Sequence, residues 1–265
     1  MQKPDYKNWV PKSMVIGLGA ATAASASLFA LFGASDRFLK GRARQAAAAA
    51  FGIATPVLLF YTAWMGALHR TFDDKGKRKL AKTIIDGTAD FVHIPDGGTG
   101  LDVGCGSGAL TIACAKRNPG AQMLGCDIWS GAYKAVFSQK RCEENAAAEG
   151  VSNVRFEEGN AVHLPFPDES FDAVTSNYVY HNIAGQNKQA LLLETLRVLK
   201  KGGTFAIHDL MSKARYGDMD AFVKKLKEEG YEDVRLVDTT DGRFMGHREA
   251  AFLGLGGSTL LVGRK

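Results

Sequence analysis

The 265-residue chain lacks several features that mark whole classes of protein. Its cysteines form no CxxC pair and have no histidine at metal-ligand spacing, which argues against a zinc site and against a disulfide framework. Residues 70–265 carry no net charge, with 26 basic and 26 acidic side chains, whereas nucleic-acid binding requires a concentrated positive surface. We therefore expect neither a metal nor a nucleic-acid partner. We also expect four reduced, buried cysteines in a cytoplasmic domain: Cys105, Cys114, Cys126 and Cys142.

Charged residues are missing from two stretches near the N-terminus, residues 13–35 and 45–69. Each stretch exceeds the roughly 20 helical residues that cross a hydrocarbon layer of about 30 Å. The second is the more apolar of the two, and Pro56 within it is tolerated in membrane helices. We therefore predict that residues 1–69 form a hydrophobic helical hairpin, which anchors the chain in a membrane through residues 14–68, and that residues 70–265 form a separate domain.

Small residues recur every four positions in the first stretch, in the series Gly17, Ala21, Ser25 and Gly19, Ala23, Ser27. Such ridges allow close helix packing in lipid, within a hairpin or in a homo-oligomer formed through these helices. Nine basic residues flank the two stretches, three before the first and six within residues 70–82, whereas the loop between them has four. This excess favours a cytoplasmic location for both ends of the hairpin, and with them for the catalytic domain. A hairpin dipping into one leaflet, a signal peptide and a helical pair buried in a soluble protein are the alternatives.

Residues 70–265 alternate between strand and helix patterns. After a helix from residue 80 to 92 and a strand at residue 99, we expect further strands at 121–126, 153–158, 171–176, 204–208, 232–237 and 258–262. Helices are expected at 130–149, 186–199 and 218–229, among others. This order predicts an α/β fold with a Rossmann-like, doubly wound, mostly parallel seven-stranded sheet. The last two strands follow each other without a predicted helix, which suggests an antiparallel edge.

Three glycines, Gly104, Gly106 and Gly108, occupy the first strand–helix turn, where a backbone without Cβ atoms can approach a ligand. Dinucleotide folds use a similar glycine pattern, so the loop alone does not choose the ligand. Asp102 would repel a diphosphate and attract a cationic amino acid group such as that of S-adenosylmethionine (SAM). Asp127, at the end of the second strand, can accept hydrogen bonds from ribose hydroxyls, a role common to NAD and SAM sites.

Four ordered motifs resemble the class I SAM-dependent methyltransferases, in particular the branch of the ubiquinone and menaquinone methyltransferases. They are LDVGCGSG at residues 101–108, DIW at 127–129, GNAVHLPFPDESFDAV at 159–174 and LRVLKKGGTF at 196–205. The resemblance covers residues 80–240. It implies that SAM is the cofactor and that its methionine part lies against Asp102, Gly104, Cys105, Gly106 and Gly108. Asp127 would hold the ribose, and the adenine would lie near Ile128, Trp129, Asn160 and Ala161. Packing in the core is the alternative role for Trp129.

The substrate side rests on NYVYHN, residues 177–182, at the carboxyl end of the fourth predicted strand. Ligands bind at that edge in open α/β sheets. Asn177 is a candidate contact to the methionine or the acceptor, and Tyr178, Tyr180 and His181 are candidate bases or orienting groups. His208, Asp209 and, in a lid, His247 and Arg248 are further candidates. We expect methyl transfer to a small apolar or membrane-associated acceptor, lipid or quinone-like. A noncatalytic SAM-binding membrane protein and a nicotinamide-dependent oxidoreductase are the rival hypotheses.

Overall fold

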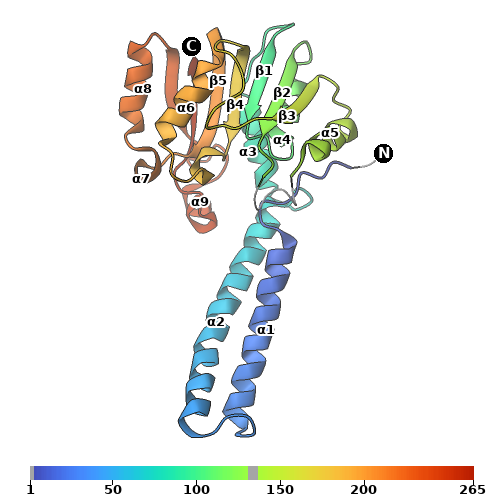
Figure 1. The fold of residues 1–265 in the computed structure, drawn as a ribbon, viewed down its shortest axis with the longest axis vertical. Coiled ribbons are helices and arrows are strands. Elements are labelled where there is room, and N and C mark those ends of the chain that lie inside the picture. Colours follow the sequence, from blue (N-terminus) through green and yellow to red (C-terminus); the bar gives the residue numbers. More distant parts are fainter. Residues whose placement is uncertain (1–2, 131–136) are drawn as a thin grey trace. The chain divides into compact units, whose positions relative to one another are not determined.

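The computed structural model describes residues 3–130 and 137–265, which form two compact units (Figure 1). The hairpin unit consists of Asn8–Lys82, and the larger unit contains residues 3–7 together with Thr83–Lys265. The hairpin unit therefore begins at residue 8 and ends at residue 82, whereas the sequence prediction gave residues 1–69. Residues 3–7 precede the hairpin in sequence but pack on the larger unit.

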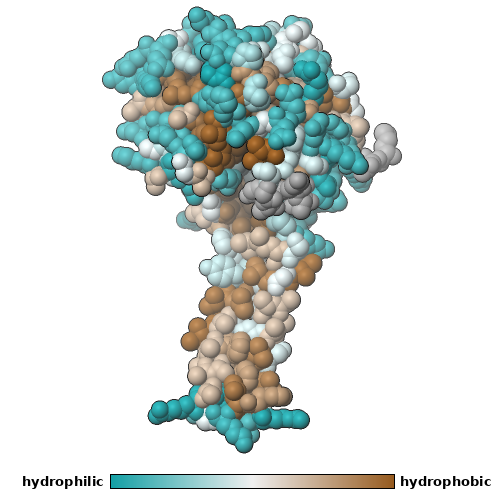
Figure 2. Space-filling model, in the orientation of Figure 1, coloured by the Kyte–Doolittle hydropathy of each residue, from teal (hydrophilic) through white to brown (hydrophobic). Residues whose placement is uncertain are grey.

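The hairpin unit contains two long helices, α1 (Lys12–Ala34) and α2 (Gly41–Phe72). At 1.5 Å per residue they measure about 34 Å and about 48 Å. Both are long and apolar enough to span a membrane. Apolar residues cover the visible face of the hairpin, and polar residues cover its tip (Figure 2). In the tip, Arg44 donates to the carbonyls of Phe32 and Gly33 and so satisfies the end of α1.

The hairpin has a polar seam and an apolar exterior. Ser25 is buried and bonds Thr55 at 2.9 Å between hydroxyl oxygens, and Thr22 bonds Thr62 at 3.0 Å. Gly19 of the predicted small-residue ridges lies on this seam, where an added Cβ would come within 3.9 Å of Thr62. Large apolar side chains of the hairpin are instead exposed, among them Ile16, Phe29, Ile53, Val57, Leu59 and Phe60. This pattern inverts that of a soluble helical pair.

The larger unit is built on a seven-stranded sheet of order β3-β2-β1-β4-β5-β7-β6. All neighbouring pairs are parallel except those made by β7, which runs antiparallel to both β5 and β6. The strands are β1 (Thr99–Val103), β2 (Gln122–Asp127), β3 (Val154–Glu158), β4 (Phe171–Asn177), β5 (Leu199–Leu210), β6 (Glu232–Asp238) and β7 (Ser258–Arg264). The predicted Rossmann-like sheet is confirmed.

Side chains that alternate along the strands pack into two hydrophobic cores, one on each face of the sheet. On one face Leu101, Leu124 and Phe205 pack against α6 (Lys188–Arg197), α7 (Lys213–Tyr216) and α8 (Met219–Glu228). On the other face, Met123 and Ala206 pack with α3 (Leu80–Ala89) and α4 (Ala109–Arg117). Burial of both faces is what a parallel sheet requires.

Three local predictions were wrong. The helix expected at 130–149 is α5 (Gln139–Ala148), because Ser138 caps it by accepting a hydrogen bond from the Arg141 N–H; residues 131–136 lie outside the described residues. The fifth strand begins at Leu199 rather than 204, with a register shift where it pairs with β4. Finally, a helix, α9 (His247–Leu253), lies between β6 and β7, where none was expected. These two strands do form the predicted antiparallel edge, with β7 inserted between β5 and β6.

Candidate active site

The turn between β1 and α4 is held in a left-handed conformation by its glycines. The φ angles of Gly104, Gly106 and Gly108 are +73°, +56° and +81°. A Cβ added to Gly106 would meet no atom of the described residues within 4 Å, so the backbone there borders space that these residues leave open. This is the environment expected of a loop whose backbone contacts a ligand.

Asp127 at the end of β2 organises the neighbouring backbone. One carboxylate oxygen accepts from the Gly106 N–H at 2.9 Å, and the other accepts from the Trp129 N–H at 2.9 Å. Because each carboxylate oxygen has two lone pairs, both oxygens retain capacity for ribose hydroxyls. Asp127 therefore links the cofactor loop to the predicted ribose site.

The two residues after Asp127 differ in exposure. The Trp129 indole donates to the Gly106 carbonyl at 3.0 Å and packs against a core cluster that includes Cys105 and Phe156. Ile128 is 47% exposed beside it. The structure therefore favours Ile128 as the adenine contact and gives Trp129 a packing role on the loop.

Asp102 lies beneath the glycine loop and is 1% exposed. It accepts a hydrogen bond from the Thr111 hydroxyl of α4 at 2.6 Å. Burial raises the pKa of Asp102 to about 7, although the hydrogen bonds from Thr111 oppose the rise. Among the described residues this carboxylate bonds α4 and not the glycine loop, so its role toward a bound ammonium group stays a prediction.

Asn160 and Ala161 follow β3, at the same sheet edge. The Asn160 side chain is exposed, and its Oδ1 accepts from the Val162 N–H at 2.9 Å, which leaves the amide NH₂ and one lone pair for a ligand. Ala161 is buried in the core, and Val162 is exposed. The adenine assignment of this segment stays a prediction that now rests on Asn160.

Gly104 brings the cofactor loop against the segment after β4. A Cβ on Gly104 would lie 2.4 Å from a methyl carbon of Val179, so only glycine permits this approach. The predicted cofactor and substrate residues thus meet at the carboxyl edge of β1 and β4. That edge is where ligands bind in this type of sheet.

His181 and Asp209 form a pair at this edge. His181 lies in a short 3₁₀ helix (Tyr180–Asn182), and its Nδ1 is 2.5 Å from Oδ1 of Asp209, a fully buried residue at the end of β5. Burial acts to raise the pKa of Asp209, but hydrogen bonding and charge from His181 outweigh it and lower that pKa. Nε2 of His181 has no partner among the described residues, and the side chain is 19% exposed. A carboxylate that holds one imidazole nitrogen leaves the other available as a base.

Tyr178 and Asn177, the other two candidates, are tied into the core. The Tyr178 hydroxyl lies 2.6 Å from Ser258 Oγ, and burial raises the pKa of Tyr178. Asn177 Oδ1 lies 2.8 Å from Nδ1 of His208, whose pKa burial lowers to about 3. His208 is therefore neutral at physiological pH. The geometry favours His181 as the reactive group and these residues as its support.

The remaining candidates lie elsewhere at this edge or in the core. Tyr180 is fully buried and bonds the Thr195 hydroxyl at 2.6 Å. His247 begins α9, within the predicted lid, and its Nδ1 lies 2.8 Å from the Thr240 hydroxyl. All four cysteines are buried and none is in a disulfide.

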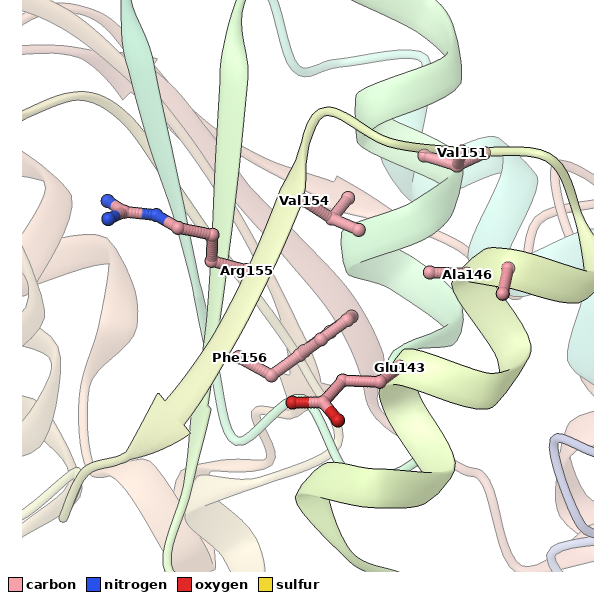
Figure 3. Close-up of a pocket in the computed structure, with 7 residues that line it drawn as sticks. Glu143, Ala146, Val151, Val154, Arg155 and Phe156 are labelled. Carbon is pink, nitrogen blue, oxygen red and sulfur yellow. The ribbon is translucent and has the colours of Figure 1, made fainter.

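A groove of about 410 Å³ lies between α5 and β3, and none of the predicted site residues lines it among the described residues. Phe156 and Val154 point toward α5 in this groove, whereas Arg155 points to the other side of β3 (Figure 3). The groove contains no residue of the glycine loop and no member of the His181–Asp209 pair. We therefore do not place the reaction there.

Sequence reasoning missed the residues that hold the glycine loop from outside. Asn145 of α5 donates to the carbonyl of Ser107 at 3.0 Å and accepts from the Asp5 N–H at 2.7 Å. No pattern in the sequence connects positions 140 residues apart. The contact of Val179 with Gly104 was missed for the same reason.

Comparison with known proteins agrees with this geometry. Residues 101–207 match a family described as a methyltransferase domain. A demethylmenaquinone methyltransferase of Geobacillus stearothermophilus is 29% identical over 60% of this chain and 70% of its own length. An arsenite methyltransferase of Halobacterium salinarum is 36% identical over 48% of this chain and 31% of its own length. For most of the curated relatives it matches, the chain spans half of their length or less.

The fold also has solved counterparts. A geranyl diphosphate methyltransferase superposes with a TM-score of 0.54 at 17% identity, over 72% of this chain and 79% of that one. Residues 101–207 thus form a methyltransferase domain. In its glycine loop and sheet order, the chain is similar to the class I SAM-dependent methyltransferases, whose cofactor is SAM.

Proposed function

We propose that this protein transfers a methyl group from SAM to a small apolar acceptor that partitions into a membrane. The observation that carries the proposal is the meeting of the open glycine loop, Asp127 and the His181–Asp209 pair at one sheet edge. The residues fit the cofactor. The open side of Gly106 leaves room for the methionine part, Asp127 can accept from the ribose, and exposed Ile128 and Val162 offer apolar contact to the adenine.

SAM supplies a methyl group already activated on a sulfonium. The protein must therefore align the acceptor, exclude water and remove any proton that the acceptor loses. Asp209 holds Nδ1 of His181, so that Nε2 faces away as the proton acceptor. The buried network of Tyr178, Asn177 and His208 fixes the position of the loop that carries His181.

The apolar acceptor is supported by the hairpin and by one relative. Two apolar helices with exposed large side chains favour residence at a membrane, with the catalytic domain on the cytoplasmic side, where SAM is made. The Geobacillus relative is named for methylation of a quinone-type ring compound. An arsenite acceptor, suggested by the Halobacterium relative, is disfavoured because trivalent arsenic seeks thiolates and all four cysteines here are buried.

The test is methyl transfer from radiolabelled SAM by the purified full-length protein, with total membrane lipid and cytosolic metabolites as separate acceptors. We expect label in the solvent-extractable lipid fraction and stoichiometric release of S-adenosylhomocysteine. Label confined to the cytosolic fraction would disprove the apolar acceptor. SAM binding without any turnover would establish the noncatalytic alternative.

Asp127→Ala should weaken SAM binding by at least tenfold. It removes the acceptor for ribose hydroxyls and the anchor of the Gly106 and Trp129 N–H groups, and hydrogen bonds to a charged group are worth about 1.5–3 kcal/mol each. Calorimetric titration with SAM measures the change, with circular dichroism to verify folding. A folded variant with normal affinity would remove Asp127 from the ribose site.

His181→Ala should lower kcat by about 10²- to 10⁴-fold, the usual contribution of a general base, and leave SAM affinity unchanged. Asp209→Asn should reproduce a smaller part of the loss, because it weakens the hold on Nδ1. The matched control is His93→Ala, at an exposed histidine. Equal rates in the His181 and His93 variants would exclude His181 as the base.

A further inference from the structure

Residues 3–7, which we call the strap, pack on the larger unit and are bonded to the glycine loop through one buried side chain. Asn145, 2% exposed on α5, accepts from the Asp5 N–H at 2.7 Å and donates to the Asp5 carbonyl at 3.3 Å. Its amide nitrogen also donates to the Ser107 carbonyl at 3.0 Å, and the Ser107 hydroxyl donates to the Tyr6 carbonyl at 3.0 Å. One amide thus joins the backbones of the strap and of the loop.

Side chains of the strap fix it in place. The Tyr6 ring packs against the cluster formed by Cys105, Ile112, Cys142, Ala146 and Phe156, next to the groove of Figure 3, and its hydroxyl donates to Glu149 at 3.2 Å. Desolvation, with the charge of Glu149 adding to it, raises the pKa of Tyr6, which keeps that hydroxyl protonated. Asp5 pairs with Arg141 at 2.9 Å on the surface. The strap is therefore built into the larger unit.

The loop residue held by the strap sits between two glycines of positive φ. Ser107 separates Gly106, which borders the cofactor space, from Gly108, which begins α4. Without residues 3–7, the Asn145 side chain would lose its two bonds to the Asp5 backbone and the Ser107 hydroxyl would lose its acceptor on Tyr6. The glycine-rich loop would then be held less firmly in its ligand-binding shape.

We propose that residues 5 and 6, with Asn145, are positioning residues for the cofactor loop, so that SAM affinity depends on the segment preceding the hairpin. This inference rests on the proposed SAM site. It also changes how a truncated form should behave: removal of residues 1–70 removes the strap with the hairpin, and SAM affinity falls even though the SAM-contacting residues remain.

The test compares Asp5→Pro with Asp5→Ala in the full-length protein in detergent. Proline removes the N–H that donates to Asn145. Alanine keeps this N–H and removes two exposed ion pairs, which contribute little, together with an exposed 3.4 Å hydrogen bond from the Lys7 N–H. We expect Asp5→Pro to raise the dissociation constant for SAM by about tenfold with kcat at saturating SAM retained. Asp5→Ala should stay within twofold of the parent. Equal affinities in the two variants would overturn the proposal.

Amide hydrogen exchange gives a second measurement that needs no SAM. Exchange of residues 106–109 should accelerate by about tenfold in Asp5→Pro and not in Asp5→Ala, whereas a loss of overall stability would accelerate exchange throughout the unit. Tyr6→Ala serves if the proline variant fails to fold. It removes the ring and the hydroxyl that hold the strap against α5, so it should accelerate exchange of the same residues. If the parent protein binds no SAM, the proposed function fails while the exchange experiment still decides the role of the strap.

Discussion

Gly106→Val should abolish detectable SAM binding, with an affinity loss of at least 100-fold, while the sheet stays folded. A Cβ at this position meets no atom within 4 Å among residues 3–130 and 137–265, so valine creates no clash with them. Its branched side chain would instead fill the space that we assign to the methionine part of SAM. The measurement is calorimetric titration with SAM, beside circular dichroism and a thermal melt.

Backbone strain needs separate control, because the φ of Gly106 is +56° and a β-branched residue is strained there by about 1–3 kcal/mol. Gly150 offers a matched site. It has a φ of +69°, its added Cβ also meets none of the described atoms within 4 Å, and it follows α5 outside the glycine loop. Gly150→Val should therefore lose similar stability and keep its SAM affinity. If both variants lose binding equally, strain explains the effect and the cofactor lies elsewhere.

The predictable parts of this fold are those with a local or periodic cause. The turn at Gly104–Gly108 and the carboxylate at Asp127 follow from short motifs, and the sheet follows from the alternation of apolar strands with helices. The two hydrophobic helices are visible in the sequence as charge-free runs at residues 13–35 and 45–69.

The missing parts depend on contacts between distant residues. Strand β7 follows β6 in sequence but inserts between β5 and β6, and seven residues of α9 gave too short a pattern to be detected. The His181–Asp209 pair joins residues 28 positions apart; both were candidates, but their pairing was not foreseen. The role of Asn145 could not be predicted because its side chain bonds the backbone of Asp5 and Ser107. Such bonds depend little on which side chains those two residues carry.

The second large effect that we expect is membrane retention, because a protein either inserts into the bilayer or is released by washing. Full-length protein should remain in the membrane pellet after carbonate and high-salt washes and should require detergent for release. The reason is the inverted pattern of the hairpin, with hydroxyl pairs such as Ser25–Thr55 inside and large apolar side chains outside. In lipid, such hydroxyl pairs satisfy each other and the exposed apolar surface contacts acyl chains.

A matched pair of variants separates insertion from other causes of sedimentation. Ile53 and Phe60 of α2 are 70% and 64% exposed, so Ile53→Lys with Phe60→Lys leaves the Thr22–Thr62 and Ser25–Thr55 seam intact. Each lysine near the centre of a spanning helix costs about 2.5–3.5 kcal/mol, and the double variant should move to the wash fraction. Phe38→Lys, equally exposed at 65% but located in the turn between the helices, should stay in the pellet. Release of the unaltered protein by carbonate would show that the helices are not inserted, and the proposal of a membrane-partitioned acceptor would lose its main support.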